Sequence, residues 1–383
     1  MDLMAAAREL DANDPLARWR EEFFVADPDL AYLDGNSLGM PPRRTFERIE
    51  EVMRVEWGEQ LIRSWDHWVD LPQRVGDRLA PLIGAHTGEV VVHDSTSIDL
   101  YQLIRAARRL HPDRNVLAID PADFPTDRYI VDSIAAADGL EVRSDVRDLG
   151  GVAVAIRSAI DYRTAEIADI AAEAAAAREA GAIVIWDLSH AAGLLDLDVH
   201  GLGIELAVGC TYKFLNGGPG APAFTFVAAP LIERLDEPFH GWFAQRDQFA
   251  MGPSFEPRPD IGRMLVGTPN ILGLVAAQCG IAVTADAGIG AVRAKSIELG
   301  RFGLRCCDEL GLTTSTPRDD ARRGGHLCVH HRDARTIVPR LVDEHGVLAD
   351  FREPDVVRLG CSPLTTRFTD VARAMLAVAA CAG

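Results

Sequence analysis

Two short apolar runs, each followed by a charged residue, limit most strongly what this chain can fold into. Residues 182–186 lead directly into Asp187, and residues 206–210 are followed within three positions by Lys213. Each run has the length and the boundaries of a buried strand. In open α/β sheets, ligands bind beyond the carboxyl ends of the strands. The sequence therefore predicts an aspartate and a lysine at one ligand-binding edge of a parallel sheet.

Strand-like and helix-like segments alternate through the middle of the chain. Further strands are predicted at 89–92, 115–119 and 152–156. One helix is predicted at 97–110 and another at 165–180, with Thr164 as the N-cap of the second and Gly181 at its end. This alternation indicates βαβ units, and hence an α/β fold with a mostly parallel sheet flanked by helices.

The pattern changes after about residue 270. Long helices are expected at 271–287 and 290–309, and they are followed by short strands and a last helix, at 326–330, 356–360 and from Thr369. A chain of 383 residues is long enough for two or three packed units of roughly 150 residues. We predict an N-terminal segment that packs on the small domain, a large domain and a smaller α+β C-terminal domain, at 1–45, 46–269 and 270–383.

Charge and cysteine content argue against several functions. The formal net charge is -18 and the pI about 5.0, so the surface repels nucleic acids and anionic membranes. The seven cysteines form no CxxC pair, which favours reduced thiols in a cytoplasmic protein, and we predict no metal site. No apolar stretch reaches 18 residues and the N-terminus has no apolar signal region, so neither a membrane span nor a signal peptide is expected.

An aspartate and a lysine at such an edge suit pyridoxal 5'-phosphate (PLP). Lys213 can hold the aldehyde as a Schiff base, and Asp187 can keep the pyridine nitrogen protonated. Glycines follow Lys213 at 217, 218 and 220 and allow close approach of the backbone to a ligand. His190 would lie near the ring or its hydroxyl, although a structural histidine is almost as good an interpretation.

Other segments have a functional and a structural interpretation. Residues 94–99 lie between a strand and a helix, where hydroxyls and free N–H groups bind anions, but simple helix capping gives the same pattern. Phe124 could stack on an aromatic ring beside Asp127, or anchor an ordinary turn. Arg358 stands in an apolar strand, where either a substrate carboxylate or a structural salt bridge would offset its burial. An aromatic wall or simple core packing would explain Trp65, Trp68 and Trp242.

Nine motifs, in order, resemble those of kynureninases, which are PLP enzymes of the fold-type I superfamily. The resemblance covers most of the chain from Tyr32 onward. The motifs stand at 32–42, 57–65, 94–103, 124–129, 183–193, 210–220, 241–243, 266–272 and 346–360.

The resemblance implies a role for each matching residue. Catalytic roles are implied for Lys213, Asp187 and Tyr212. Cofactor contacts are implied for Thr96, Ser97, Phe124, Asp127, Ser158, Asp187, His190, Tyr212, Lys213, Trp242 and Thr268. Substrate contacts are implied for Asn36, Ser37, Trp65 and Arg358. It also implies a homodimer with shared active sites, to which the partner chain contributes Trp242 and Thr268.

The implied reaction is the hydrolysis of L-kynurenine, or of a ring-substituted kynurenine, to anthranilate and L-alanine. Trp65, Gly267 and Thr268 resemble the bacterial pattern, which favours kynurenine over its 3-hydroxy form. Departures from the family pattern at Ala165, Ala244–Gln245 and Thr365 leave the ring substituents open. The alternatives are a cysteine desulfurase-like lyase or an aminotransferase of the same fold, and a non-catalytic protein that retains the fold.

Overall fold

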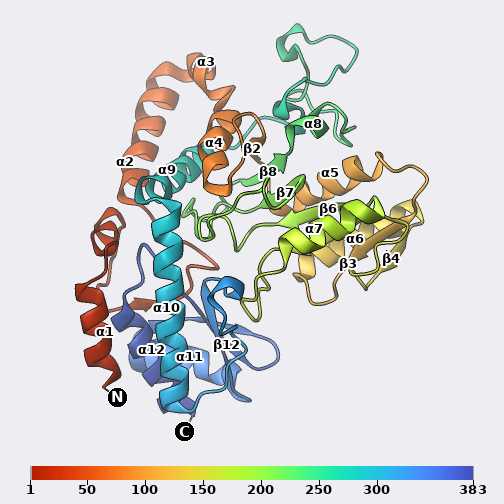
Figure 1. Ribbon diagram of the computed structural model, residues 1–383. Helices are drawn as coiled ribbons and strands as arrows, with labels where there is room; N and C mark the ends of the chain where they lie inside the picture. The colour runs from red at the N-terminus through yellow and green to blue at the C-terminus, as the bar shows by residue number, and fades with distance from the viewer. Residues whose placement is uncertain (1, 383) are drawn as a thin grey trace.

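A seven-stranded sheet forms the centre of the computed structural model, which describes residues 2–382 (Figure 1). The strand order is β2-β8-β7-β6-β5-β3-β4, and β8 alone runs antiparallel to its neighbours. The strands are β2 (Val90–His93), β3 (Val116–Ile119), β4 (Glu141–Arg143), β5 (Val152–Ser158), β6 (Ile183–Asp187), β7 (Leu206–Gly209) and β8 (Ala223–Val227). The predicted α/β fold with a mostly parallel sheet is confirmed.

Helices cover both faces of this sheet. Side chains alternate along each strand, so that Ile185 packs in one apolar cluster while Val184 and Trp186 pack in another on the opposite face. Both clusters are buried, which explains why the strands read as continuous apolar runs. The helices of this region are α4 (Leu71–Leu79), α5 (Thr96–Arg108), α6 (Pro125–Asp138), α7 (Ile170–Ala180) and α8 (Ala229–Ile232).

Helix α7 begins later than the sequence predicts. Its N-cap is Asp169, whose side chain accepts a hydrogen bond from the Ala172 N–H, and Thr164 does not cap it. Glu166 and Ile167 form backbone bridges instead, with Arg323 and Ile160 respectively, and Ala165 before them has a left-handed φ of 66°. These backbone pairings satisfy the groups that a longer helix would have used. Gly181 ends the helix in a left-handed conformation, as expected.

The C-terminal part combines long helices with a small antiparallel sheet. Its helices are α9 (Ile271–Ala287), α10 (Ile289–Leu310), α11 (Ala334–His345) and α12 (Phe368–Ala382). Among the described residues, three strands form the sheet in the order β11 (Asp350–Arg352), β12 (Val356–Gly360) and β9 (His326–His330). Its central strand β12 carries Arg358 toward the large domain, where the Arg358 guanidinium bonds to the Tyr162 carbonyl.

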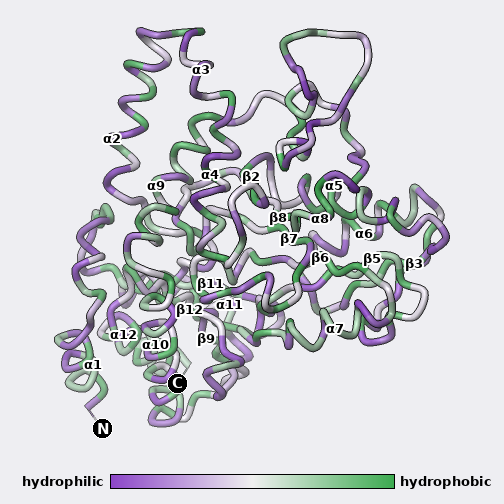
Figure 2. The backbone as a smooth tube through the Cα atoms, turned by 45° about the horizontal axis from the view of Figure 1, so that its top comes forward, coloured by the Kyte–Doolittle hydropathy of each residue, from purple (hydrophilic) through white to green (hydrophobic). Residues whose placement is uncertain are grey.

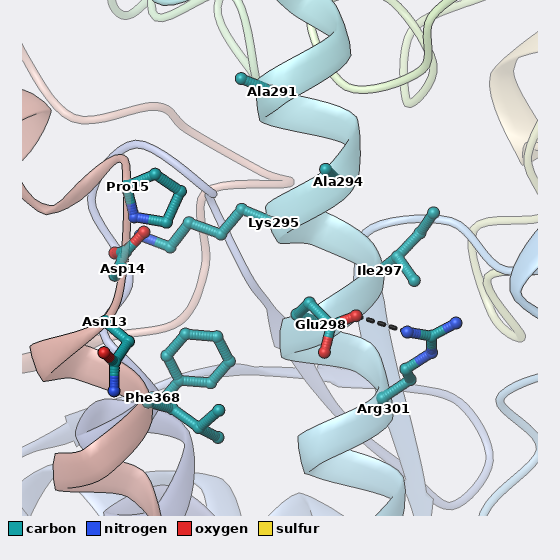
Figure 3. Close-up of a pocket in the computed structure, with 11 residues that line it drawn as sticks. Asn13, Asp14, Pro15, Ala291, Ala294, Lys295, Ile297, Glu298, Arg301 and Phe368 are labelled. Carbon is teal, nitrogen blue, oxygen red and sulfur yellow. Dashed lines mark hydrogen bonds and ion pairs between the residues drawn. The ribbon is translucent and has the colours of Figure 1, made fainter.

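The N-terminal segment packs on this C-terminal part. Helix α1 (Leu3–Ala12) lies against α12, and β1 (Ala31–Tyr32) pairs in parallel with β10 (Val347–Leu348). A groove of about 530 Å³ lies between α1 and α10, and the ammonium of Lys295 sits 2.6 Å from Asp14 there (Figure 3). Both side chains are almost fully buried, and their ion pair joins α10 to the segment that follows α1.

An arm of helices, which follows the N-terminal segment in the sequence, projects from the large domain (Figure 1). It consists of α2 (Arg43–Glu51), the π-helix η2 (Val52–Gln60), η3 (Leu61–Ser64) and α3 (Trp65–Trp68). Hydrophilic and hydrophobic positions alternate along the arm (Figure 2), and Met53, Trp57 and Ile62 are exposed on it. The remaining short helices are η1 (Ala17–Glu22), η4 (Ala80–Ile83), η5 (Gln248–Ala250), η6 (Ile261–Met264) and η7 (Asp320–Arg322).

Within residues 2–382, no single helix has the length and hydropathy needed to cross a membrane. Helices α9 and α10 meet that test only as a pair, and the pair is bent by 81°.

Candidate active site

A small cavity of about 160 Å³ lies beyond the carboxyl ends of β5, β6 and β7, where the two apolar runs end. The start of α5 and the loop before α6 close it on the other side. Its lining includes nine of the eleven predicted cofactor contacts: Thr96, Ser97, Phe124, Asp127, Ser158, Asp187, His190, Tyr212 and Lys213. The described residues that sequence reasoning missed in this lining are Thr126, Ile160, Tyr162 and Ser189.

Lys213 enters the cavity from the loop that follows β7. Its ammonium lies 6.0 Å from the centroid of the Phe124 ring and 5.9 Å from that of Tyr212. The chain has only two lysines, and the other, Lys295, is paired with Asp14. Lys213 is therefore the only lysine of the sequence that can react with a ligand at this edge.

Asp187 is the last residue of β6 and is 9% exposed. Its Oδ1 accepts a hydrogen bond of 2.8 Å from the Ser189 N–H, which fixes the carboxylate. None of the described residues donates a hydrogen bond to Oδ2, so that oxygen can bind a ligand atom. Ser189 is held in turn, because its hydroxyl accepts a hydrogen bond from the Cys210 N–H.

Asp127 and His190 are buried in the lining with atoms that have no partner in residues 2–382. These atoms are Oδ2 of Asp127 and Nε2 of His190. Burial, then the nearby charges of Asp187 and Asp123, raise the pKa of Asp127 well above its usual value, and Lys213 opposes the shift. Burial and the positive charge of Lys213 lower the pKa of His190, so its imidazole is neutral. Unpaired buried groups cost about 1–3 kcal/mol each, so their presence together indicates a ligand site.

The start of α5 forms the opposite end of the cavity. The helix begins at Thr96, so its first N–H groups have no partner within the helix and favour an anion. Thr96 and Ser97 line the cavity there. Asp94 turns the chain into the helix with a positive φ of 30°. An anionic group such as a phosphate would suit this end of the cavity.

Arg358 lies on the small-domain side and is 1% exposed. Its Nε donates to Asp350 Oδ1 at 2.9 Å, its Nη1 to the Tyr162 carbonyl at 3.0 Å, and its Nη2 to Ser37 Oγ at 2.9 Å. The structural salt bridge is therefore present, with Asp350 as a partner that sequence reasoning missed. Asn36 is fully buried nearby, and neither atom of its carboxamide has a partner among residues 2–382.

Trp65, Trp242 and Thr268 do not line the cavity in the described part of the chain. The rings of Trp65 and Trp242 instead pack on Phe243, with centroid distances of 6.0 and 4.5 Å. Gly241 lies against the backbone of Val266, where an added Cβ would clash, so the two segments touch at this point. Trp68 packs edge-on against Trp65. These aromatic residues form one cluster, separate from the cavity.

Comparison with known proteins identifies the family. The chain is 40% identical to the kynureninase of Pseudomonas fluorescens, over 94% of this chain and 91% of that protein. It is 40% identical to the kynureninase of Deinococcus radiodurans, over 98% of this chain and 96% of that protein. The chain belongs to the kynureninase family. A family profile described as the kynureninase C-terminal domain also matches residues 292–378.

Solved structures show the same fold at low identity. A cysteine desulfurase from Thermococcus onnurineus superposes with a TM-score of 0.79 at 16% identity, covering 95% of both chains. An alanine–glyoxylate aminotransferase from Nostoc superposes with a TM-score of 0.69 at 15% identity, covering 93% of this chain and 96% of that one. These likenesses confirm the fold-type I architecture.

The cofactor of kynureninases is PLP, and the cavity fits it. The only reactive lysine, a fixed carboxylate and a helix N-terminus line one cavity, which are the groups that the aldehyde, the ring nitrogen and the phosphate of PLP require. The unpaired atoms of Asp127 and His190 offer two further polar contacts. The assignment of individual contacts stays a prediction.

Cys328 does not suit the role of the nucleophilic thiol that a cysteine desulfurase reaction requires. This residue lies inside β9, is fully buried, and burial raises its pKa to about 12. All seven cysteines are free and buried in the described residues.

The departures from the family pattern also lie outside the cavity lining. Gln245 bonds to the backbone of Ser254 and Glu256, and the Thr365 carbonyl accepts a hydrogen bond from Arg20.

Proposed function

We propose that this chain hydrolyses L-kynurenine, or a ring-substituted kynurenine, to anthranilate and L-alanine. The bond between Cβ and Cγ breaks, and one water molecule supplies a hydroxyl group to the new carboxylic acid and a proton to the alanine. One observation carries the proposal: Lys213 and Asp187 share a cavity in a chain that matches kynureninases over nearly its whole length.

The lining residues would hold the cofactor in one orientation. Thr96, Ser97 and the free N–H groups of α5 would bind its phosphate, and Asp187 would bind its ring nitrogen. Phe124 would stack on the ring, and His190 would contact the ring hydroxyl. When bound, PLP supplies an electron sink for the electron pair that remains when Cα of the substrate loses its proton.

Lys213 would accept the Cα proton of the substrate and return a proton later. A lysine amine can act in both directions, as a base when it is neutral and as an acid once it is protonated. Asp187 would keep the ring nitrogen protonated, because Ser189 fixes its carboxylate at the end of β6. Arg358 would bind the substrate carboxylate from the small domain.

Tyr212 would donate a proton at the reacting carbonyl. Burial, then the neighbouring Cys210 and Asp187, raise the pKa of its phenol, so the hydroxyl stays protonated and can donate. A positioned proton donor of this kind contributes about 10²–10⁴-fold to a rate.

The test is to add L-kynurenine, 3-hydroxy-L-kynurenine and L-cysteine separately to the purified protein with PLP. We expect anthranilate fluorescence and alanine from L-kynurenine, at a higher kcat/KM than for the 3-hydroxy form. Release of sulfide from cysteine without anthranilate would contradict the proposal and favour a lyase.

We also propose a homodimer in which the partner completes each site. The Trp65–Phe243–Trp242 cluster supports it, because Trp242 is 39% exposed away from its own cavity. A groove of about 810 Å³ beside the loop 216–221, together with the exposed apolar side chains of the arm, offers a surface for a second copy. Mixing Lys213→Ala and Trp242→Ala proteins should restore activity, because each hybrid dimer then has one intact site. Failure to restore activity would contradict shared sites.

The domain boundaries and the cellular location are proposals as well. We propose parts at 1–45, 46–269 and 270–383, supported by the apolar cluster that α1, α10 and α12 share. We propose a reducing, cytoplasmic compartment, supported by the seven buried free thiols.

A further inference from the structure

His326 lies between the two halves of the site, and nothing described so far uses it. It is the first residue of β9 and is 2% exposed. Within residues 2–382, neither Nδ1 nor Nε2 has a partner at normal hydrogen-bond geometry, although the Asp161 backbone lies near enough to act on the ring. Its ring centroid is 5.7 Å from that of His190, which lines the cofactor cavity. A buried imidazole with both nitrogens unpaired requires an explanation.

The strand register places His326 beside Arg358. In the β12–β9 pair, Arg358 lies opposite Cys328 and Gly360 opposite His326. Side chains two residues apart on a strand point to the same face, so His326 and Arg358 share a face as diagonal neighbours. A row of side chains therefore connects the cofactor cavity with the expected carboxylate site, in the order His190, His326 and Arg358.

Asn36 joins His326 at this point. An added Cβ on Gly360 would lie 1.7 Å from Asn36 Oδ1, so the absence of a side chain at Gly360 makes room for the carboxamide. Because Gly360 is the partner of His326 across the strands, Asn36 reaches the same place from the N-terminal segment. Both atoms of its carboxamide are unpaired among the described residues, like those of His326.

Arg358 by itself has little capacity left for a substrate. A guanidinium has five N–H donors. Two of them bond to Asp350, one to Ser37 and one to the Tyr162 carbonyl, which leaves one. A carboxylate has two oxygens and accepts several hydrogen bonds, so other donors must complete its site.

We infer that His326, together with Asn36, donates hydrogen bonds to the α-carboxylate of the substrate beside Arg358. The inference rests on the proposed function and names a carboxylate-binding residue for that same site. Each of the two side chains has an unpaired donor, and the remaining N–H of Arg358 supplies a third.

The ring of His326 is neutral, so it donates as an N–H and not as a cation. Burial lowers its pKa well below the usual value, and the positive charges of Arg358, Lys213 and Arg352 lower it further, while the Asp161 backbone acts in the opposite direction. Arg358 therefore supplies the charge of the site, and His326 supplies a second, directional contact. Discrimination against ligands without the carboxylate would follow from this contact.

The experiment measures equilibrium binding through the absorbance of the PLP-loaded protein. L-alanine, the proposed amino-acid product, is compared with ethylamine, which lacks only the carboxylate. The variants are His326→Leu, which removes the donor, and His326→Gln, which keeps one. His330→Leu is the matched control, because His330 lies at the far end of the same strand and pairs with Asp355.

We expect His326→Leu to weaken L-alanine binding about tenfold or more and to leave ethylamine binding within about twofold. His326→Gln should recover most of the affinity, and His330→Leu should bind both ligands like the wild type. Equal weakening of both ligands, or unchanged L-alanine binding, would overturn the inference. If wild-type protein binds L-alanine but forms no anthranilate, the proposed function fails while the carboxylate contact is still measured.

Discussion

The cofactor cavity and the cluster of Arg358 with Asp350, Ser37 and Tyr162, here called the Arg358 cluster, differ in how far their polar groups are already paired. In the cavity, Asp127 and His190 keep unpaired atoms, and Asp187 has one carboxylate oxygen without a donor in the described residues. On the small-domain side, Arg358 is held by Asp350, Ser37 and Tyr162. One region is completed by a ligand, whereas the other is completed mainly by the chain itself.

This difference separates activity from stability. Groups in the cavity contribute little to the folded protein until a ligand binds, so their substitution should reduce catalysis more than stability. The Arg358 cluster joins the N-terminal segment, the large domain and β12, so its substitution should affect both. The predictions below test this contrast.

The largest effect is expected for Lys213→Ala. We predict a loss of anthranilate formation by more than about 10³-fold, because the lysine both holds the cofactor and moves the proton. The matched variant is Lys295→Met, which should lower the unfolding free energy by about 3 kcal/mol, because it leaves Asp14 buried and unpaired, yet keep kcat. Steady-state assays and thermal unfolding of both proteins measure the two effects. Loss of kcat in Lys295→Met would contradict the contrast.

Tyr212→Phe should have the next largest effect. Removal of the phenol is expected to lower kcat by about 10²-fold or more while the apparent affinity for L-alanine stays near that of the wild type. The comparison of kcat with an absorbance titration separates the two quantities. An unchanged kcat would exclude Tyr212 as the proton donor.

Asp350→Asn should raise KM for L-kynurenine about tenfold and lower the unfolding free energy by about 1–3 kcal/mol. The reason is that Arg358 is 1% exposed and loses the carboxylate that fixes its Nε edge. Asp187→Asn, in contrast, should lower kcat with a smaller loss of stability. Denaturant unfolding measures the loss of stability in each variant. Equal losses in Asp350→Asn and Asp187→Asn would contradict the contrast between the Arg358 cluster and the cavity.

The smallest effect concerns pH. Burial, then the charge of Asp350, raise the pKa of Asp34 to about 7, while Ser37 and Arg358 oppose the shift. The folded state thus favours the protonated acid, so this contribution to stability is lost as the pH rises from about 4 through 7. Asp34→Asn should show a smaller fall of Tm between pH 5 and 8 than the wild type. Parallel Tm profiles of the two proteins would contradict this assignment.

The strand edges could be predicted because they depend on local patterns. Buried parallel strands read as short apolar runs, and the residue after each run falls at the same edge of the sheet. Asp187 and Lys213 followed from this rule alone. The sequence holds a further signal, because it contains only two lysines, and the structure pairs the other one, Lys295, with Asp14.

Contacts between distant segments could not be read in the same way. The start of α7 was predicted wrongly because Glu166 and Ile167 pair with Arg323 and Ile160, and no local pattern reveals these partners. His326 meets Asn36 only through the register of β9 and β12. The role of Asp350 as the partner of Arg358 could in principle have been predicted, since the two residues face each other across a short antiparallel strand pair. The sequence likewise could not predict that Trp65 and Trp242 lie apart from the cavity, because this depends on the three-dimensional structure.

The most direct measurement is to reduce the PLP-loaded protein with borohydride and map the labelled peptide. Hydride addition fixes the cofactor to the lysine that holds it. The label is predicted on the peptide that contains Lys213, and none on the one that contains Lys295. A label on Lys295, or no label on either peptide, would contradict the assignment of the active site to the edge of the sheet beyond β6 and β7.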